Sequence, residues 1–464
     1  MSIGLTVHQI AQAVASGQRS AVQVLEEHIA RIEATDPAIN AFTSRRFAQA
    51  RQQATAIDAR RQRGEALGSL AGVPFAVKNL FDVAGDVTMA GSAVLRDHPP
   101  ANRHAVLVER LLAADAVLLG SLNMDEFAYG FTTENHHHGA THNPHRAGHT
   151  AGGSSGGSGA AVAAAQVPLT LGSDTNGSIR VPASFCGVWG LKPTLGRLSR
   201  RGCYPFVDSL DHLGPLANDV TGLALTYDAL QGPDPQDPGC HALGIDPTTE
   251  GLHLGTQGLR IGVLGGYFHE QAGPAARAAV EAAATALGAR DEVLWPDAAQ
   301  ARAAAFVISA SEGGSRHLPL LRRCPEALEP LSVDRFIAGA LQPAAWYLRA
   351  QRFRHLHRKR VNALFHDWDV LLAPATPLSA PAIGTEWIDI NGQRLPCRAS
   401  IGVLTQPISL SGCPVVAAPL WPAGSDGLPI GVQLIAAPWR EDLALRTAHA
   451  LQASGVARLR PPAA

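Results

Sequence analysis

The chain has 464 residues, of which 46% are hydrophobic, and a formal net charge of −1. This length and composition predict a globular protein with a sizeable core, and the near-zero charge does not favour nucleic acid or an anionic membrane surface as a partner. The six cysteines lack CxxC spacing, which argues against a zinc site and a disulfide framework. The N-terminus has no signal-peptide features, and no long uncharged apolar run predicts a membrane span. Together these features indicate a soluble cytoplasmic protein.

The first part of the chain is predicted to be helical. Ser20 and Gln23 have the spacing of a capping box. Apolar residues then recur with helical periodicity at Val22, Leu25, Ile29 and Ile32. Pro37 is expected to end this helix, because proline disfavours helical backbone in the residue before it. A second, arginine-rich helix is expected from Phe47 to Gly64.

After Gly64, short apolar runs bounded by Gly and Pro alternate with helical segments. These runs are Val73–Asn79, Ala116–Asn123, Pro168–Ser173, Leu259–Gly266, Asp369–Pro374, Pro414–Leu420 and Ile430–Ala436. Because they are apolar on both faces, they predict an α/β protein whose sheet is covered by helices on both sides. We therefore expect residues 1–66 to form an N-terminal helical segment that packs on the core or on a partner, and residues 67–464 to form the main domain.

The stretch GGSSGGSG, Gly152–Gly159, is the most unusual local sequence. A flexible linker is disfavoured because an alanine-rich helix and a strand are expected directly after it, and a phosphate loop is disfavoured because GxxxxGK[ST] and GxGxxG are absent. A second glycine–serine loop, GSDTNGSIR, follows at Gly172–Arg180. Such loops turn backbone N–H groups toward one point, so the pair predicts an active-site wall that stabilises an oxyanion. The run His136–His138 is interpreted as a histidine-rich loop, because adjacent residues cannot all face one metal ion.

Several motifs together resemble the amidase signature family. These are, in chain order, AGVPFAVKN, GSLNMDEFAYG, GGSSGGSGAAVAAA, LGSDTNGSIRVPASFCGVWGLKPTLGRLSR, SLDHLGP and GLPIGVQLIA. The resemblance covers roughly Leu67 to Leu451 and is specific, because independent motifs agree in order and spacing. It implies a large twisted mixed β-sheet with helices on both faces, an amidohydrolase activity and no metal or organic cofactor.

The resemblance also implies a Ser–Ser–Lys triad. Ser178 matches the family's nucleophile, Ser154 matches the bridging serine that follows a cis peptide bond, and Lys78 matches the general base. The residue types suit this chemistry, since a serine hydroxyl needs a neighbour that takes its proton and a buried lysine can become neutral enough to do so. Arginine could not replace Lys78, and this chain otherwise has only Lys192 and Lys359.

Further roles are carried over from the family to the surrounding residues. The oxyanion hole is expected from the backbone N–H groups of Thr175, Asn176, Gly177 and Ser178, where Asn176 replaces the glycine of the commoner DTGGS sequence. We expect Ser155, Asp174 and Arg180 to support this loop, and Cys186 to be a packed thiol. The expected substrate-binding residues are Tyr129, Gly130, Gly153 and Arg354. For Tyr129 a role in core packing remains equally open, and for Arg354 the alternative is a solvated helix arginine.

Two branches of the family are candidates for the specificity. The sequences TTENHHHGATHNPH, DTNGSIRVPAS and SLDHLGP are more similar to the catalytic chain of carboxybiuret hydrolase than to the glutamine-hydrolysing chain of glutamyl-tRNA amidotransferase. In the amidotransferase branch an aspartate binds the ammonium of glutamine, and Gly402 stands at that place here. Arg354 matches the arginine by which that branch binds the substrate carboxylate, a group that a carboxybiuret-like substrate also carries.

The sequence therefore predicts an amidohydrolase that releases ammonia from a small linear amide of the carboxybiuret kind. The glutamine-hydrolysing chain of an amidotransferase and a general aliphatic or aryl amidase stay open as alternatives, and a non-catalytic scaffold protein is a further one. The partners that the resemblance suggests are a second copy of the chain and a small helical accessory subunit. Residues 271–344 carry no readable motif, and we expect them to shape the mouth of the pocket.

Overall fold

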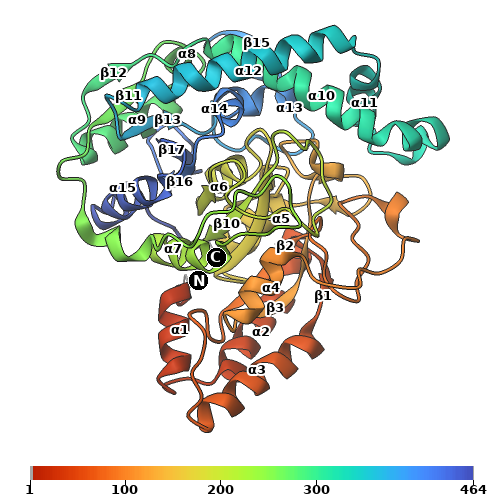
Figure 1. Ribbon diagram of the computed structural model, residues 1–464, viewed down its shortest axis with the longest axis vertical. Coiled ribbons are helices and arrows are strands. Elements are labelled where there is room, and N and C mark those ends of the chain that lie inside the picture. The colour runs from red at the N-terminus through yellow and green to blue at the C-terminus, as the bar shows by residue number, and fades with distance from the viewer. Residues whose placement is uncertain (1–3, 463–464) are drawn as a thin grey trace.

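The computed structural model, which describes residues 4–462, is built on one mixed 11-stranded sheet (Figure 1). Its strand order is β1-β3-β2-β8-β10-β9-β16-β17-β13-β11-β12. The strands are β1 (Phe42–Arg45), β2 (Pro74–Lys78), β3 (Val117–Leu122), β8 (Leu169–Asp174), β9 (Trp189–Lys192), β10 (His212–Ala217), β11 (Ile261–Leu264), β12 (Asp291–Val293), β13 (Val370–Pro374), β16 (Val415–Leu420) and β17 (Ile430–Ala436). Small two-stranded sheets pair β4 (Glu134–Asn135) with β5 (Gly139–Ala140), β6 (His142–Asn143) with β7 (Arg146–Thr150), and β14 (Trp387–Ile390) with β15 (Gln393–Pro396).

Parallel and antiparallel pairs alternate in blocks across the large sheet. Strand β2 runs parallel to β3 and β8, whereas β10 runs antiparallel to β8 and β9. Strands β2, β3, β8, β16 and β17 are buried along their whole length. A strand that is buried on both faces needs apolar side chains on both faces, which is the pattern of the predicted runs. The predicted α/β fold with a large mixed sheet is confirmed.

Helices surround the sheet and continue the main core. They are α1 (Val7–Ala15), α2 (Ala21–Ile39), α3 (Phe47–Gln62), α4 (Val106–Ala113), α5 (Gly156–Ala163), α6 (Arg180–Cys186), α7 (Val220–Leu230), α8 (Tyr267–Glu270), α9 (Pro274–Leu287), α10 (Ala298–Arg323), α11 (Val333–Ala340), α12 (Ala344–Leu364), α13 (Cys397–Ser400), α14 (Gln406–Ser411) and α15 (Glu441–Ala453). Helices α10, α11 and α12 lie together along the top of Figure 1, and α10 packs on both of the others and on α14.

The N-terminal segment does more than pack on the surface of the sheet. Strand β1 pairs antiparallel with β3 and so forms one edge of the large sheet, below which α1, α2 and α3 lie in Figure 1. The prediction that Pro37 ends the first long helix is wrong, because α2 continues to Ile39 and stops at Asn40, which has a left-handed φ of 58°. The steric effect of proline on the preceding residue is a bias, and in the last turn the packing of α2 outweighs it.

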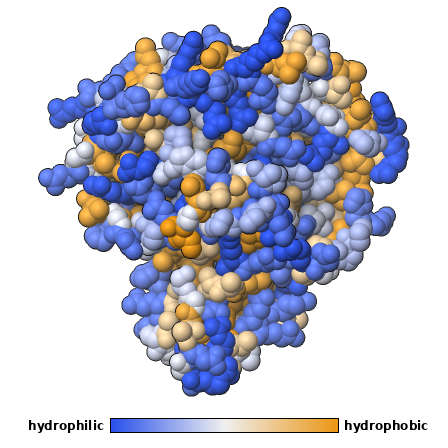
Figure 2. All heavy atoms as spheres, viewed as in Figure 1, coloured by the Kyte–Doolittle hydropathy of each residue, from blue (hydrophilic) through white to orange (hydrophobic). Residues whose placement is uncertain are grey.

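The molecular surface is mixed in character. Figure 2 shows hydrophilic side chains over most of one face, with hydrophobic side chains scattered among them. Within residues 4–462, no helix combines the length and the apolar character needed to cross a membrane.

Candidate active site

The stretch Gly152–Gly159 is a buried wall that follows strand β7 and continues into helix α5, which begins at Gly156. The peptide bond between Gly153 and Ser154 is cis. Ser155 Oγ donates to the Ser173 carbonyl at 3.1 Å, which ties the start of α5 to the end of β8. At Gly157, an added Cβ would lie 2.6 Å from the backbone nitrogen of Asn123. The glycines therefore permit an approach of backbone to backbone that a side chain would block.

Lys78 is the last residue of strand β2, and its side chain contacts this buried stretch at Ser154. Its Nζ donates to Ser154 Oγ at 2.7 Å and to Ser173 Oγ at 2.9 Å, and the side chain is fully buried. Burial lowers the pKa of Lys78 to about 7, although the negative charge of Asp125 opposes this shift. Because both partners are hydroxyl groups, a neutral Lys78 can accept a proton from Ser154.

Ser178 follows β8 and precedes α6, on the loop of the second glycine–serine motif. Only 3% of the residue is exposed, and it lines a narrow cavity of about 20 Å³. Ser154 is completely buried. The structure therefore places Ser178 at the cavity and the contact between Ser154 and Lys78 inside the protein.

Asp174 organises the loop that carries Ser178. Its carboxylate accepts hydrogen bonds from the Gly177 N–H at 2.7 Å and from the Ile179 N–H at 3.2 Å, and it forms a bidentate ion pair with the buried guanidinium of Arg180. Burial alone would raise the pKa of Asp174, but the charge and hydrogen bonds of Arg180 outweigh this effect and hold the pKa well below its usual range. The loop is thus rigidly anchored.

This anchoring bears on the expected oxyanion hole. The N–H of Gly177 points to Asp174 and is engaged there. In the described part of the chain, the N–H groups of Thr175, Asn176 and Ser178 have no such partner. These three N–H groups are the ones that remain to meet an oxyanion.

The cavity at Ser178 brings together residues from both halves of the chain. Its lining consists of Ala128, Tyr129, Gly130, Phe131, Thr175, Asn176, Ser178, Phe206, Phe306, Ser309, Arg335 and Gln406. Tyr129 and Gly130 lie there as the sequence suggested, and the Tyr129 ring also packs on Phe206 with a centroid distance of 4.8 Å. Gly153 is outside the lining, because it lies against Asp125 and the backbone of Thr132.

Arg354 lies outside this cavity. Its Nη2 donates to the Ser209 carbonyl at 2.5 Å and its Nη1 to Gln351 Oε1 at 3.4 Å. The arginine at the cavity is Arg335 on α11, which the sequence analysis missed. It lies within residues 271–344, where no motif marks it, and only the packing of α11 against α10 brings it to Ser178.

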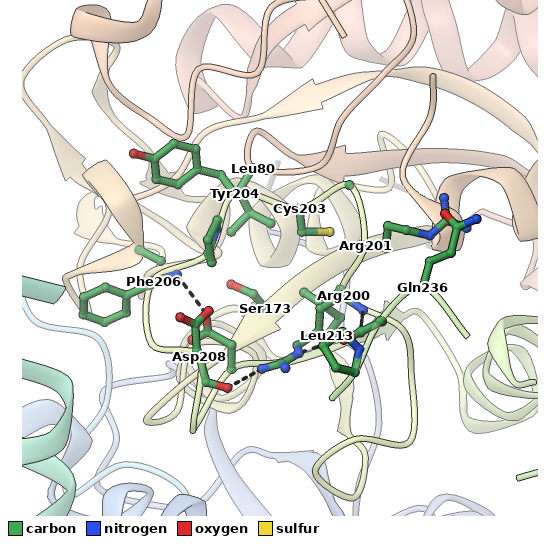
Figure 3. A pocket seen from close by; sticks show the side chains of 16 residues that line it. Leu80, Ser173, Arg200, Arg201, Cys203, Tyr204, Phe206, Asp208, Leu213 and Gln236 are labelled. Atoms are coloured by element: carbon green, nitrogen blue, oxygen red, sulfur yellow. Dashed lines mark hydrogen bonds and ion pairs between the residues drawn. The ribbon is translucent and has the colours of Figure 1, made fainter. Parts of the chain in front are cut away.

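A second, wider cavity of about 410 Å³ opens beside the first (Figure 3). Ala128 and Phe206 line both cavities. Ser173, which accepts a hydrogen bond from Lys78, lies among the lining residues shown in Figure 3. One of the two hydroxyl groups that contact Lys78 therefore lies at this second cavity.

The other nucleophilic or metal-binding candidates have structural partners. His137 Nε2 lies 2.8 Å from Glu126 Oε1. In the part of the chain that the structure describes, no group of three or more His, Cys, Asp and Glu side chains is arranged to hold a metal ion. Cys186 Sγ donates to the Ala151 carbonyl, and burial raises the pKa of this thiol, so it is a packed and unreactive group.

Comparisons with known proteins show which proteins the chain is similar to. A family model described as Amidase matches residues 23–445. The chain is 68% identical over 452 residues to AtzE, the 1-carboxybiuret hydrolase protein of Pseudomonas sp. (strain ADP), covering 97% of this chain and 99% of that one. It is 38% identical over 476 residues to the GatA-type chain of glutamyl-tRNA(Gln) amidotransferase from Chloroflexus aggregans, covering 97% and 96%. A solved structure described as a vestigial protein complex that reveals the evolutionary origins of an s-triazine catabolic enzyme matches with a TM-score of 0.98 and 67% identity, covering 98% of this chain and 100% of that one.

Proposed function

The chain belongs to the amidase family, and on this premise we propose that it hydrolyses a carbon–nitrogen bond of a carboxybiuret-like linear amide and releases ammonia. The observation that carries the chemistry is the 2.7 Å hydrogen bond between the buried Lys78 Nζ and Ser154 Oγ, next to a cavity lined by Ser178. The 68% identity to a carboxybiuret hydrolase protein supports the substrate class.

The proposed reaction begins when Ser178 Oγ attacks the terminal amide carbon. The proton of Ser178 passes to Ser154, whose own proton passes to neutral Lys78, and the N–H groups of Thr175, Asn176 and Ser178 stabilise the oxyanion. The carbon–nitrogen bond then breaks, the nitrogen takes the proton back through the same relay, and ammonia leaves. Water attacks the acyl-enzyme with the relay again accepting its proton, which releases the carboxylic acid and restores Ser178.

The residues that line this cavity suit glutamine less well than a carboxylated urea. A glutamine ammonium needs a carboxylate, and among residues 4–462 no acidic side chain lines the cavity at Ser178. At Gly402, an added Cβ would lie 2.4 Å from the ring of Phe131, which itself lines the cavity. The place where the amidotransferase branch carries its aspartate is thus filled by an aromatic ring.

The test is ammonia release by the purified chain from carboxybiuret, glutamine and a simple aliphatic amide, with Ser178→Ala as the blank. We expect turnover of carboxybiuret that disappears in the variant. Turnover of glutamine above that of carboxybiuret would contradict the proposal and assign the chain to the amidotransferase branch. Turnover of the simple amide alone would keep the serine chemistry and remove the carboxylated substrate.

We further propose that the chain works in the cytoplasm, with a small helical accessory subunit or as a homodimer. Support comes from the six unpaired cysteines and from the matching structure, which was solved as a protein complex. Light scattering of the chain, alone and co-expressed with a small subunit encoded beside it, tests this proposal. A monomer of unchanged activity in both preparations would contradict it.

A further inference from the structure

Arg335 is the single charged side chain that lines the cavity at Ser178, among residues 4–462. Its guanidinium lies 3.8 Å from the centroid of the Tyr129 ring, and Nη1 donates to the Tyr129 carbonyl at 3.4 Å. In the described chain no carboxylate lies within ion-pair distance of it. Arg335 is partly buried, and this burial lowers its pKa.

Two other arginines that point into the protein have carboxylate partners. Arg180 forms its bidentate pair with Asp174, and Arg398 pairs with Asp125 at 3.4 Å. A desolvated cation is costly unless an anion meets it, and an arginine fork matches a carboxylate in shape and charge. Arg335 therefore has no carboxylate partner of the kind that Arg180 and Arg398 have, and its unpaired guanidinium lines the cavity.

Asn176 provides a second polar group without a partner in the same cavity. Its Nδ2 donates to Ser309 Oγ at 2.8 Å, whereas its Oδ1 is buried and has no hydrogen-bond partner in the described structure. The residue is only 8% exposed. A buried acceptor without a partner is unfavourable, and the N–H of a ligand would satisfy it. Asn176 also replaces a glycine of the commoner loop sequence, so this acceptor is specific to chains with DTNGS.

We propose that Arg335 and Asn176 form a recognition site for a carboxylated urea, in which Arg335 binds the carboxylate and Asn176 Oδ1 accepts a hydrogen bond from a urea N–H. This inference rests on the proposed function. The arrangement presents the uncharged end of the substrate to Ser178 and keeps its carboxyl end at α11. It explains how the site accepts a carboxylate although Arg354 is turned away from the cavity.

The cavity is small, so it must widen before the substrate can bind. About 20 Å³ holds roughly one water molecule, which is too little for a carboxylated urea. The guanidinium of Arg335 is held by a ring face and one long hydrogen bond, and a bidentate bond to a carboxylate is stronger than either contact. The substrate thus opens the space it occupies by drawing Arg335 away from Tyr129.

The first experiment compares Arg335→Met with the wild type on carboxybiuret and on biuret, which lacks the carboxylate. We expect the KM for carboxybiuret to rise about 100-fold with a much smaller change in kcat, and the kcat/KM for biuret to stay within about 3-fold. Arg335→Lys keeps the charge without the fork and is expected to lie between. Arg352→Met, at an exposed arginine of α12, is the matched control and is expected to behave as the wild type.

A second experiment examines Asn176→Gly, which restores the commoner loop sequence. We expect it to lose about 10-fold in kcat/KM for carboxybiuret and to gain activity toward simple aliphatic amides.

Calorimetric titration of carboxybiuret into Ser178→Ala, with and without Arg335→Gln, measures binding directly if Arg335→Met proves insoluble. A tenfold or greater loss of affinity in the double variant is expected.

The outcomes separate this inference from the function on which it rests. If the wild type does not hydrolyse carboxybiuret while Ser178 still reacts with an acylating probe, the proposed function is wrong. If the wild type hydrolyses it and Arg335→Met retains the wild-type KM, the function stands and the recognition site is wrong. If Arg354→Met instead raises the KM about 100-fold at unchanged stability, the carboxylate lies where the sequence alignment placed it.

Discussion

Lys78 and Lys192 are both fully buried, and burial lowers the pKa of each to about 7. Their partners differ in kind. Lys192 Nζ donates to the carbonyl oxygens of Pro193 and Cys413, at 3.0 Å and 2.6 Å, and these oxygens can only accept hydrogen bonds. Lys78 contacts two hydroxyl groups, which can both give and take a proton. The same side chain in the same kind of burial is therefore a structural donor in one place and, in the proposed mechanism, the base in the other.

The pH dependence of turnover follows from the lowered pKa of Lys78. Only the neutral amine can accept a proton, so we expect kcat to fall as the pH drops below about 7 and to level off above it. Ammonia release between pH 5.5 and 9 measures this profile. Lys192→Met removes the other buried lysine and is expected to leave the midpoint in place. Near-wild-type turnover by Lys78→Arg would contradict the role of Lys78.

The same lowered pKa predicts a stability cost. In the unfolded chain lysine has a pKa of about 10.4, so the unfolded state binds more protons than the folded state between about pH 7 and pH 10.4. Stability is therefore lowest below the folded pKa and rises with pH through this window. We expect Lys78→Met to be inactive but more stable than the wild type at pH 6, with the difference shrinking toward pH 10. Urea denaturation at both pH values measures it, and a less stable variant at pH 6 would contradict the cost.

At the scale of elements, the sequence predicts well those site residues that lie within a recognisable local motif. Ser154 and Ser178 lie on loops whose glycine spacing is itself the signal, and Lys78 ends a strand whose apolar run is readable. Arg335 could not be predicted, because its place depends on how α11 packs over residues distant in sequence. Strand β10, HLGPLA, was not expected either, since Gly and Pro disfavour strands and only its neighbours β8 and β9 stabilise it.

The position of α11 depends on glycines at its contact with α10. A Cβ added at Gly339 would lie 1.9 Å from the carbonyl oxygen of Ala310, so the two helices approach more closely than a side chain allows. We expect Gly339→Ala to push α11 outward, to lower stability by about 1–3 kcal/mol and to raise the KM for carboxybiuret, because Arg335 moves with the helix.

Thermal denaturation and steady-state kinetics measure these effects. The matched control is Gly244→Ala, because a Cβ at Gly244 has no atom within 4 Å and the residue lies far from α11 in the sequence. An unchanged KM in Gly339→Ala, together with the expected loss of stability, would show that the position of α11 does not set substrate affinity.

At the scale of the whole molecule, the site joins segments that lie far apart in the sequence. Lys78 comes from β2, the third strand from one edge, whereas Arg335 comes from α11, which packs on α10 along the top of Figure 1. Buried residues of the N-terminal helices, such as Val14, Leu25 and Ile32, belong to the same core as strands β16 and β17. We therefore expect the chain to unfold as one cooperative unit, in which the N-terminal segment supports the strand that carries Lys78.

This continuity predicts the effect of removing residues 1–66. The deletion takes away β1, exposes the edge of β3 and removes Gln53, whose Oε1 accepts a hydrogen bond from the Leu118 N–H of β3 at 3.0 Å. Because an unpaired edge and an uncovered core favour aggregation, we expect residues 67–464 alone to be insoluble or to lack a cooperative thermal transition. Co-expression of residues 1–66 as a separate chain is expected to restore soluble, active enzyme. A truncated chain that is monomeric, melts cooperatively and keeps the wild-type kcat would show instead that the segment is a separable addition.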